Sequence, residues 1–384
     1  MAPGRPVRIL IVDDSAVMRR LLRAVVASAT GLEVVGTACD GVSALNALAF
    51  ENPDIVLLDV EMPVMDGLVT LRELRAKRHK MPVIMCSSLT HRGAGVTIEA
   101  LASGASDYVA KPSGQFSRDE AFQRLARELI PKILALTGRS QPPPTRLLPH
   151  TVSQAPRPPL PLPAPSSSAE LPHTIPFVLA IGVSTGGPAA LDVLLPALPA
   201  GFPLPVLVVQ HMPEVFTGTF AERLGRRCAL RVHEAIEGEP VSAGVIYIAR
   251  GNWHMETLPA PRLGAPATIH LNQDPPENHC RPAVDVLFRS LARVYGGGVL
   301  AVVLTGMGSD GLAGCRLVRA QGGRILAQDQ ASSTVWGMPG AVAQAGLAHM
   351  VLPLAAIAPE ILNLTNRTGA GLRNPSSTTG RMVV

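Results

Sequence analysis

The sequence predicts an α/β protein of two domains, each built on a doubly wound parallel sheet, with a proline-rich linker between them. In both halves short apolar runs alternate with helical patterns, which is typical of parallel sheets with right-handed crossovers. The segment 139–176 holds 12 prolines. At 384 residues and 47% hydrophobic content, the chain can bury two separate cores. We expect domains at 1–138 and 177–366, a linker at 139–176 and a disordered tail at 367–384.

Five strand patterns precede the linker, and amphipathic helical patterns separate them. The expected strands are 8–12, 33–37, 54–58, 82–86 and 107–110. Helical patterns include 16–27 and 68–76, and the amphipathic segment 119–136 completes five strand-helix units.

The half after the linker repeats this alternation. Its expected strands are 177–183, 205–210, 244–249 and 299–304, with helical patterns at 189–198, 284–294 and 311–320. The stretch 259–276 is rich in loop residues and contains one hairpin-strand pattern at 268–271.

Proline fixes φ and cannot donate to a β-ladder, so the linker should be an extended spacer. An alternative is that 158–165 docks a partner as a polyproline helix.

The composition excludes several classes of protein. No apolar run approaches the roughly 18 residues that cross a bilayer, and no secretory signal is recognisable, so we expect a cytoplasmic protein without direct membrane insertion. The net charge of +5 is spread along the chain, and we expect no nucleic-acid partner. All four lysines precede the linker, which excludes a lysine nucleophile or Walker-type lysine from the second domain.

Chemically compatible side chains follow consecutive strands of the first domain. They are Asp13, Asp14, Asp59, Ser87 and Lys111. The carboxyl ends of parallel strands meet at one edge of the sheet, so we expect these groups to converge. Clustered carboxylates repel one another unless a cation neutralises them, and an all-oxygen ligand set suits Mg²⁺. The alternative for a single residue such as Asp13 is a helix cap.

These residues lie in motifs that resemble the response-regulator receiver family. The motifs are Ile11-Val12-Asp13-Asp14-Ser15, Leu58-Asp59-Val60-Glu61-Met62-Pro63, Met65-Asp66-Gly67 and Ala110-Lys111-Pro112. The resemblance implies a flavodoxin-like domain in which Asp59 accepts a phosphoryl group from a histidine kinase. It also implies that Asp13, Asp14 and Asp59 hold Mg²⁺, that Ser87 contacts the phosphoryl group and that Lys111 pairs with it.

The second domain offers a serine in a strand-to-helix turn. Ser184 follows an apolar strand, is surrounded by small glycines and precedes Pro188, which is typical of a first helical turn. A glycine-rich anion cradle is the alternative interpretation. His211 ends another strong strand and could act as general base. His254 is a weaker candidate that could also end a strand.

The orienting acid should also lie beyond a strand, and Asp310 meets this condition. Asp285 is its competitor, but it is expected in the first turn of a helix, where an acid complements the dipole. Backbone amides near Thr185 and Met307 are oxyanion candidates. The order serine, histidine, acid differs from the α/β-hydrolase order, which argues against a lipase-type esterase.

This half resembles the chemotaxis protein-glutamate methylesterases. The motifs are Ile181-Gly182-Val183-Ser184-Thr185-Gly186-Gly187-Pro188, Gln210-His211-Met212, Arg281-Pro282-Ala283-Val284-Asp285-Val286-Leu287-Phe288, Leu304-Thr305-Gly306-Met307-Gly308-Ser309-Asp310-Gly311 and Val335-Trp336-Gly337-Met338-Pro339. The resemblance implies a Rossmann-like domain, without a cofactor of its own, that hydrolyses glutamyl methyl esters and deamidates glutamines on chemoreceptors. It also implies that the unphosphorylated receiver covers the active site.

Two other readings remain open at this point. The output domain could bind a partner without catalysis, or the hydrolase could act on a receptor-like protein outside chemotaxis.

Overall fold

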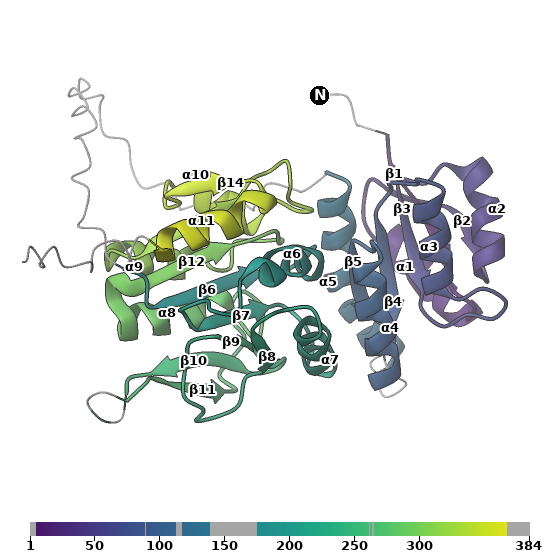
Figure 1. Cartoon of the computed structure of the whole chain (residues 1–384). Coiled ribbons are helices and arrows are strands. Elements are labelled where there is room, and N and C mark those ends of the chain that lie inside the picture. The colour runs from purple at the N-terminus through teal and green to yellow at the C-terminus, as the bar shows by residue number, and fades with distance from the viewer. Residues whose placement is uncertain are drawn as a thin grey trace, which may run out of the picture.

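The computed structural model describes residues 5–88, 90–112, 117–138, 175–260, 262 and 265–366. These residues form two parallel sheets with helices on both faces, which confirms the predicted fold class (Figure 1). Most of the expected linker, 139–174, and the expected tail, 367–384, lie outside the described residues. The expected domain boundaries therefore remain predictions.

The first sheet has the strand order β2-β1-β3-β4-β5, and each neighbouring pair runs parallel. Its strands are β1 (Val7–Val12), β2 (Leu32–Ala38), β3 (Ile55–Asp59), β4 (Val83–Ser87) and β5 (Asp107–Ala110). Its helices are α1 (Ala16–Ala27), α2 (Gly41–Glu51), α3 (Gly67–Ala76), α4 (His91–Ala102) and α5 (Arg118–Leu136). Helices α1 and α5 pack on one face, and α2, α3 and α4 pack on the other.

Helix α1 illustrates why these segments fold as they do. Ser15 has an extended backbone, and its side chain accepts a hydrogen bond from the Met18 amide, so it caps the helix. The helix then buries Leu22, Val25 and Val26 against the sheet. The apolar spacing is that of one helical face, which explains why the sequence predicted the bounds of α1 correctly.

The second sheet has the order β14-β13-β12-β6-β7-β9-β8 and is also parallel throughout. Its strands are β6 (Val178–Val183), β7 (Val206–Gln210), β8 (Arg231–Glu234), β9 (Val245–Ile248), β12 (Val299–Val303), β13 (Arg324–Gln328) and β14 (Met350–Leu352). Strands β10 (His254–Leu258) and β11 (Thr268–Asn272) form a separate antiparallel pair. The sequence pattern did not predict β8, β10, β13 or β14.

Helices cover both faces of this second sheet. They are α6 (Gly187–Leu194), α7 (Glu214–Gly225), α8 (Val284–Tyr295), α9 (Leu312–Ala320), α10 (Met338–Gln344) and α11 (Leu354–Asn366), with short 3₁₀ turns η1 (Leu195–Ala197) and η2 (Gly296–Gly298). The buried side chains place α6, α7 and α11 on one face and α8, α9 and α10 on the other. No helix within the described ranges is both long and apolar enough to span a bilayer.

The two halves pack directly against each other. Helix α4 of the first sheet contacts α6 and α7 of the second, and Figure 1 shows these helices side by side. One buried apolar cluster runs from the α4 face of the first half into the α6 and α7 face of the second. Within this cluster the rings of Tyr108 and Phe216 stack with their centroids 4.9 Å apart. The interface is therefore continuous with the hydrophobic core.

Candidate active site and phosphoacceptor pocket

The candidate catalytic residues stand where the strand order of the second sheet reverses. The chain runs outward from β6 through β7 on one side, and β12 lies on the other side of β6. Ligands in open α/β sheets gather beyond the carboxyl ends of the strands at such a point. Ser184 follows β6 and His211 follows β7 directly, and Asp310 lies in the loop between β12 and α9.

Hydrogen bonds define the turn that carries Ser184. The Ser184 amide donates to the Thr305 carbonyl over 3.0 Å, and the Gly187 amide donates to the Ser184 carbonyl over 2.8 Å. Gly186 has φ +78°, where a side chain would be strained, and a Cβ there would also lie 2.4 Å from Thr334. The sharp turn into α6 leaves the Ser184 side chain half-buried at the edge of the sheet.

Gln210 ties this turn to the candidate base. Its side chain is 2% exposed, and Nε2 donates to the carbonyls of Ser184 at 3.1 Å and His211 at 3.2 Å. No role was predicted for Gln210 from the sequence, although it directly precedes His211. An inward-facing polar residue at the end of an otherwise apolar strand was the available signal.

The packing of Gln210 predicts a contrast between two glycine substitutions. A Cβ on Gly187 would lie 2.0 Å from Gln210 Oε1, whereas a Cβ on Gly218 within α7 meets nothing within 4 Å. We expect Gly187→Ala to lower the free energy of unfolding by about 1–3 kcal/mol. We expect Gly218→Ala to raise it by about 0.5–1 kcal/mol. Urea unfolding measures both, and equal effects would show that Gln210 does not restrict this turn.

His211 and Asp310 form the strongest polar pair of the site. His211 Nε2 lies 2.8 Å from Asp310 Oδ2, and both side chains are largely buried. Nδ1 of the same ring faces Cys280 Sγ at 3.5 Å. Among the described residues no hydrogen bond joins the Ser184 hydroxyl to His211. The ends of their strands are nevertheless adjacent, because the His211 amide donates to the Val183 carbonyl over 3.2 Å.

Asp310 sits in front of the first turn of α8. Its carboxylate accepts bonds from the amides of Val284 at 2.7 Å and Asp285 at 3.0 Å, and Asn278 Nδ2 donates to it over 2.9 Å. Helix N-termini favour negative charge. Burial opposes ionisation, but the bond to His211 and the backbone amides outweigh it and hold the pKa of Asp310 below its usual range.

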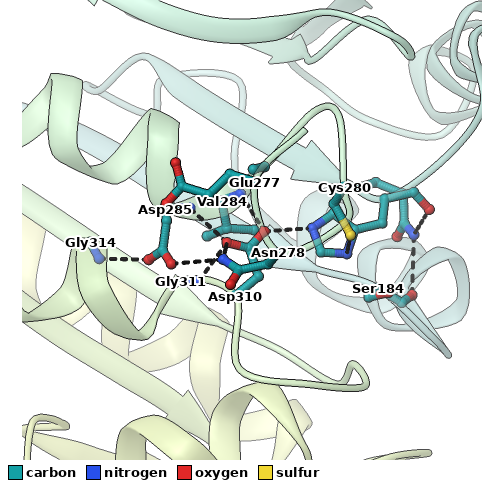
Figure 2. Close-up of polar contacts among 12 residues, drawn as sticks. Ser184, Glu277, Asn278, Cys280, Val284, Asp285, Asp310, Gly311 and Gly314 are labelled. Atoms are coloured by element: carbon teal, nitrogen blue, oxygen red, sulfur yellow. Dashed lines mark hydrogen bonds and ion pairs between the residues drawn. The ribbon is translucent and has the colours of Figure 1, made fainter. Parts of the chain in front are cut away.

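Asp285, the competing acid, does not contact His211. Its carboxylate accepts bonds from the Gly314 amide at 2.6 Å and from Asn278 Nδ2 at 3.0 Å, and it ties α8 to α9 (Figure 2). Burial is the main cause that raises its pKa. Its place in the first helical turn agrees with the expectation from sequence.

His254 is a structural histidine rather than a second base. It begins β10 instead of ending a strand, is 1% exposed, and its Nδ1 accepts a bond from the Ala283 amide over 3.2 Å. The suggestion that it ends a strand was wrong, because the apolar run Val245–Ile248 closes earlier as β9.

The pKa of His211 is raised by its partners. Burial opposes protonation of the ring, but the hydrogen bonds to Asp310 and Cys280 outweigh it and raise the pKa to about 10. The charged imidazolium is therefore favoured in this arrangement.

Two backbone amides, one in the turn and one in the neighbouring loop, have no acceptor among the described residues. They belong to Thr185 and Met307, the two oxyanion candidates, and neither donates to another described residue. The loop that carries Met307 passes close to the nucleophile turn, since a Cβ on Gly306 would lie 2.9 Å from the Ser184 Cβ. Both amides are thus available for an oxygen that develops charge.

The acidic residues of the first half converge as expected at the switch point between β1 and β3. Ligand oxygens of Asp13, Asp14 and Asp59 lie within 4.8 Å of one another, which fits a divalent cation. Lys111 Nζ lies 2.8 Å from Asp13 Oδ2 and 2.7 Å from Asp59 Oδ1. Burial raises the pKa of Asp59 to about 6, against the opposing effect of Lys111.

Ser87 lies at the end of β4, but its hydroxyl is directed towards the start of α4. It donates to the Gly93 carbonyl at 3.3 Å and accepts from Thr97 Oγ1 at 2.7 Å. No hydrogen bond to Asp59 occurs within the described residues.

The phosphoacceptor half reaches the nucleophile turn itself. Thr185 Oγ1 donates a 2.7 Å hydrogen bond to Asp107 Oδ2 at the start of β5, and Thr185 is 3% exposed. Lys132 on α5 lies 3.4 Å from Asp107 Oδ1. This contact was not predictable from the sequence, because its partners are 78 positions apart on different domains.

Fold and site together define a two-domain α/β protein, with a candidate hydrolase site at the edge of one sheet and a candidate phosphoacceptor pocket at the edge of the other. Residues 179–361 match the CheB methylesterase family, and residues 9–126 match the response regulator receiver domain. The chain belongs to the family of protein-glutamate methylesterases/protein-glutamine glutaminases, which are hydrolases with deamidase activity.

Similar proteins cover almost the whole chain. A protein-glutamate methylesterase/protein-glutamine glutaminase of Trichodesmium erythraeum is 47% identical over 92% of this chain and 98% of its own length. One of Nocardioides sp. is 48% identical over 94% of this chain and 95% of its own length. The CheB methylesterase catalytic domain of Thermotoga maritima is 39% identical, covers 50% of this chain and 100% of its own, and has a TM-score of 0.48.

Proposed function

We propose that this chain is a phosphorylation-activated esterase that hydrolyses glutamyl methyl esters on chemoreceptors and deamidates their glutamines during chemotactic adaptation. The observation that carries the catalytic assignment is the 2.8 Å pair of His211 and Asp310 beside the turn of Ser184. The names of the relatives support the substrate class.

The two contacts of the His211 ring support Nδ1 as the proton-accepting atom. Nε2 of His211 is committed to Asp310, so Nδ1 must take the proton of the Ser184 hydroxyl. Catalytic hydrogen bonds are often absent before substrate binds, so a rotation of the Ser184 side chain towards Nδ1 accompanies substrate binding. Asp310 keeps the ring oriented and stabilises the imidazolium that forms.

Ester hydrolysis then follows in two steps. The Ser184 oxygen attacks the ester carbon, and methanol leaves with the proton from His211. Water, deprotonated by His211, attacks the acyl-enzyme and releases the glutamate carboxylate and the Ser184 hydroxyl. The amides of Thr185 and Met307 hold the oxyanion in both steps, a contribution of about 10²- to 10³-fold in rate. With a glutamine substrate the leaving group is ammonia.

The first domain supplies the switch. We infer that Asp59 accepts a phosphoryl group from a histidine kinase in the cytoplasm and that Lys111 pairs with it. Asp13, Asp14 and Asp59 would hold Mg²⁺, which offsets the negative charge of the phosphoryl group when bound. Ser87 would exchange its contacts at the start of α4 for the phosphoryl oxygens.

The change in the contacts of Ser87 would be transmitted to the active site through α4 and β5. Helix α4 packs on α6 and α7, and Asp107 of β5 accepts the hydrogen bond of Thr185 beside the nucleophile. In the arrangement observed, the residue after Ser184 is buried against the receiver. A shift of α4 and β5 would free the turn for a receptor helix.

We expect a small acyl phosphate with Mg²⁺ to raise methanol release from methylated receptor by about tenfold. This corresponds to a shift of about 1.4 kcal/mol in the equilibrium between the closed and the open arrangement. The Asp107→Ala variant should show higher release without phosphodonor, because it lacks the bond to Thr185. Methanol release by the full-length chain measures both.

The control for this switch is Asp59→Asn, which should not respond to the phosphodonor. If phosphodonor left the parent unchanged, the activation would be wrong. If Asp107→Ala behaved as the parent in both states, the contact between Asp107 and Thr185 would have no inhibitory role.

A further inference from the structure

The thiol of Cys280 lies next to Nδ1 of His211, the ring nitrogen proposed to act as the base. Cys280 Sγ lies 3.5 Å from His211 Nδ1, within reach of a sulfur hydrogen bond, while Nε2 of the same ring contacts Asp310 at 2.8 Å. Figure 2 shows the sulfur beside the ring. Thiol, imidazole and carboxylate therefore form a continuous chain with the composition of a cysteine-hydrolase relay.

The surrounding structure fixes the position of this thiol. The Cys280 amide donates to the Glu277 carbonyl over 2.8 Å, and the Glu277 amide donates back to the Cys280 carbonyl over 3.1 Å. The Glu277 carboxylate is held by both terminal nitrogens of Arg289 on α8, at 2.6 and 2.5 Å. Between them, Asn278 donates to Asp310. The loop that presents the thiol is thus attached to the same acid that orients His211.

The environments of the other four cysteines differ. Cys86 and Cys315 are buried, and burial raises the pKa of both thiols. Cys228 is half-buried, and burial raises its pKa to about 11. Cys39 is exposed, and its neighbour at 3.4 Å is the Asp40 carboxylate, which cannot take up its proton as readily as imidazole. Of the five thiols, all of which are described, Cys280 alone contacts an imidazole.

We propose that Cys280 is a thiol activated by His211, that peroxides oxidise it, and that its modification turns the hydrolase off. The inference rests on the proposed role of His211 as the base for Ser184. In the reactive state the thiol proton has already moved to Nδ1, so that a thiolate faces the imidazolium, and the sulfur attacks one oxygen of the peroxide. The O–O bond breaks, and the departing hydroxide takes the proton from the imidazolium and becomes water. Cysteine is oxidised to sulfenic acid, and hydrogen peroxide is reduced to water.

Modification blocks catalysis for a geometric reason. An oxygen or a larger group on Sγ stands next to Nδ1, the atom that must receive the Ser184 proton. The same applies to a carbamidomethyl group from iodoacetamide, which makes alkylation a convenient substitute for oxidation.

Site-resolved alkylation of the folded, reduced full-length chain tests the proposal. Iodoacetamide at neutral pH is followed by mass spectrometry of the individual cysteine peptides. We expect Cys280 to react about tenfold faster than the exposed Cys39, because a base assists only Cys280. In the His211→Gln variant the rate at Cys280 should fall by about tenfold while the rate at Cys39 stays the same. Equal rates at Cys280 in parent and variant would overturn the proposal.

Loss of activity gives the second readout. Hydrogen peroxide should inactivate the parent, whereas Cys280→Ser should retain most of its own starting activity under the same exposure. If both lost activity at the same rate, the inhibitory role of Cys280 would be refuted. Protection of the buried Cys86 and Cys315 from alkylation verifies that each variant is folded.

The Ser184→Ala variant separates this proposal from the proposed catalytic function. It should keep the rapid labelling of Cys280 although it no longer hydrolyses esters. If it labelled rapidly but also hydrolysed at the parental rate, Ser184 would be refuted as nucleophile while the activated thiol would stand. If Ser184→Ala lost activity while Cys280 labelled slowly in both the parent and the variant, Ser184 would stand as the nucleophile and the activated thiol would be refuted.

Discussion

Replacing Ser184 by alanine is expected to lower methanol release from methylated receptor by at least about 10⁴-fold, with little change in KM. The variant lacks the oxygen that forms the acyl-enzyme, while the oxyanion amides of Thr185 and Met307 remain. Removal of a catalytic serine costs this much because the relay acts as a unit, and the activity that persists comes from binding and the oxyanion site. Steady-state kinetics on the phosphorylated full-length chain measure both parameters.

The matched control is Ser242→Ala, a serine near β9 whose hydroxyl contacts the Pro240 carbonyl at 3.4 Å, remote from the site. It should retain parental kcat and KM. Equal hydrolysis by Ser184→Ala and the parent would remove Ser184 as nucleophile. If neither protein released methanol above the blank, an output domain that only binds a partner would be the better account.

The strand-end residues were predictable because the signal is local. Buried parallel strands read as continuous apolar runs, so the residue that follows each run lies at the ligand-binding edge whatever the rest of the fold does. Asp13, Asp59, Ser184 and His211 were all found by this reasoning. The direction of the Ser87 hydroxyl was not predictable, because it depends on the packing of α4.

The edge strands were missed for the opposite reason. Strand β14 is short and mostly exposed, and β8 has no fully buried residue, so neither produces an apolar run. Strands at the edge of a sheet are commonly short and polar, which prevents unwanted pairing. Their positions follow from the neighbouring strands β13 and β9 rather than from their own sequence.

The roles of positioning residues outside the strands were also not predicted from the sequence. Asn278 and His279 have φ values of +51° and +63°, a conformation that tertiary contacts impose on this loop. In that conformation Asn278 donates to Asp310 and Cys280 contacts His211. The contact of Thr185 with Asp107 likewise exists only once the two domains pack together. No periodic or spacing pattern encodes such contacts.

Replacing Asp310 by asparagine is expected to lower kcat by about 10⁴-fold and to move the ascending limb of the pH profile towards lower pH. Catalysis needs neutral His211, so the rate rises as pH passes through the pKa of this imidazole. In the parent that pKa is raised to about 10, because the bonds to Asp310 and Cys280 outweigh burial. Asparagine cannot stabilise the imidazolium, so the pKa returns towards the ordinary value of about 6.5. The loss of rate reflects the wrong tautomer.

The raised pKa of His211 also determines how the stabilising effect of the His211–Asp310 pair changes with pH. Because the folded pKa of His211 is raised, the pair stabilises the fold fully below about pH 6.5, and the contribution is lost as pH rises towards 10. Asp310→Asn should therefore lower Tm more at pH 6 than at pH 10.

Asp285→Asn is the matched control, since Asp285 shares Asn278 with Asp310 but does not contact His211. Asp285→Asn should shift the ascending limb of the pH profile much less than Asp310→Asn does. Equal displacement by both variants would mean that the buried charge of the cluster, rather than the hydrogen bond from Asp310, sets the protonation of His211.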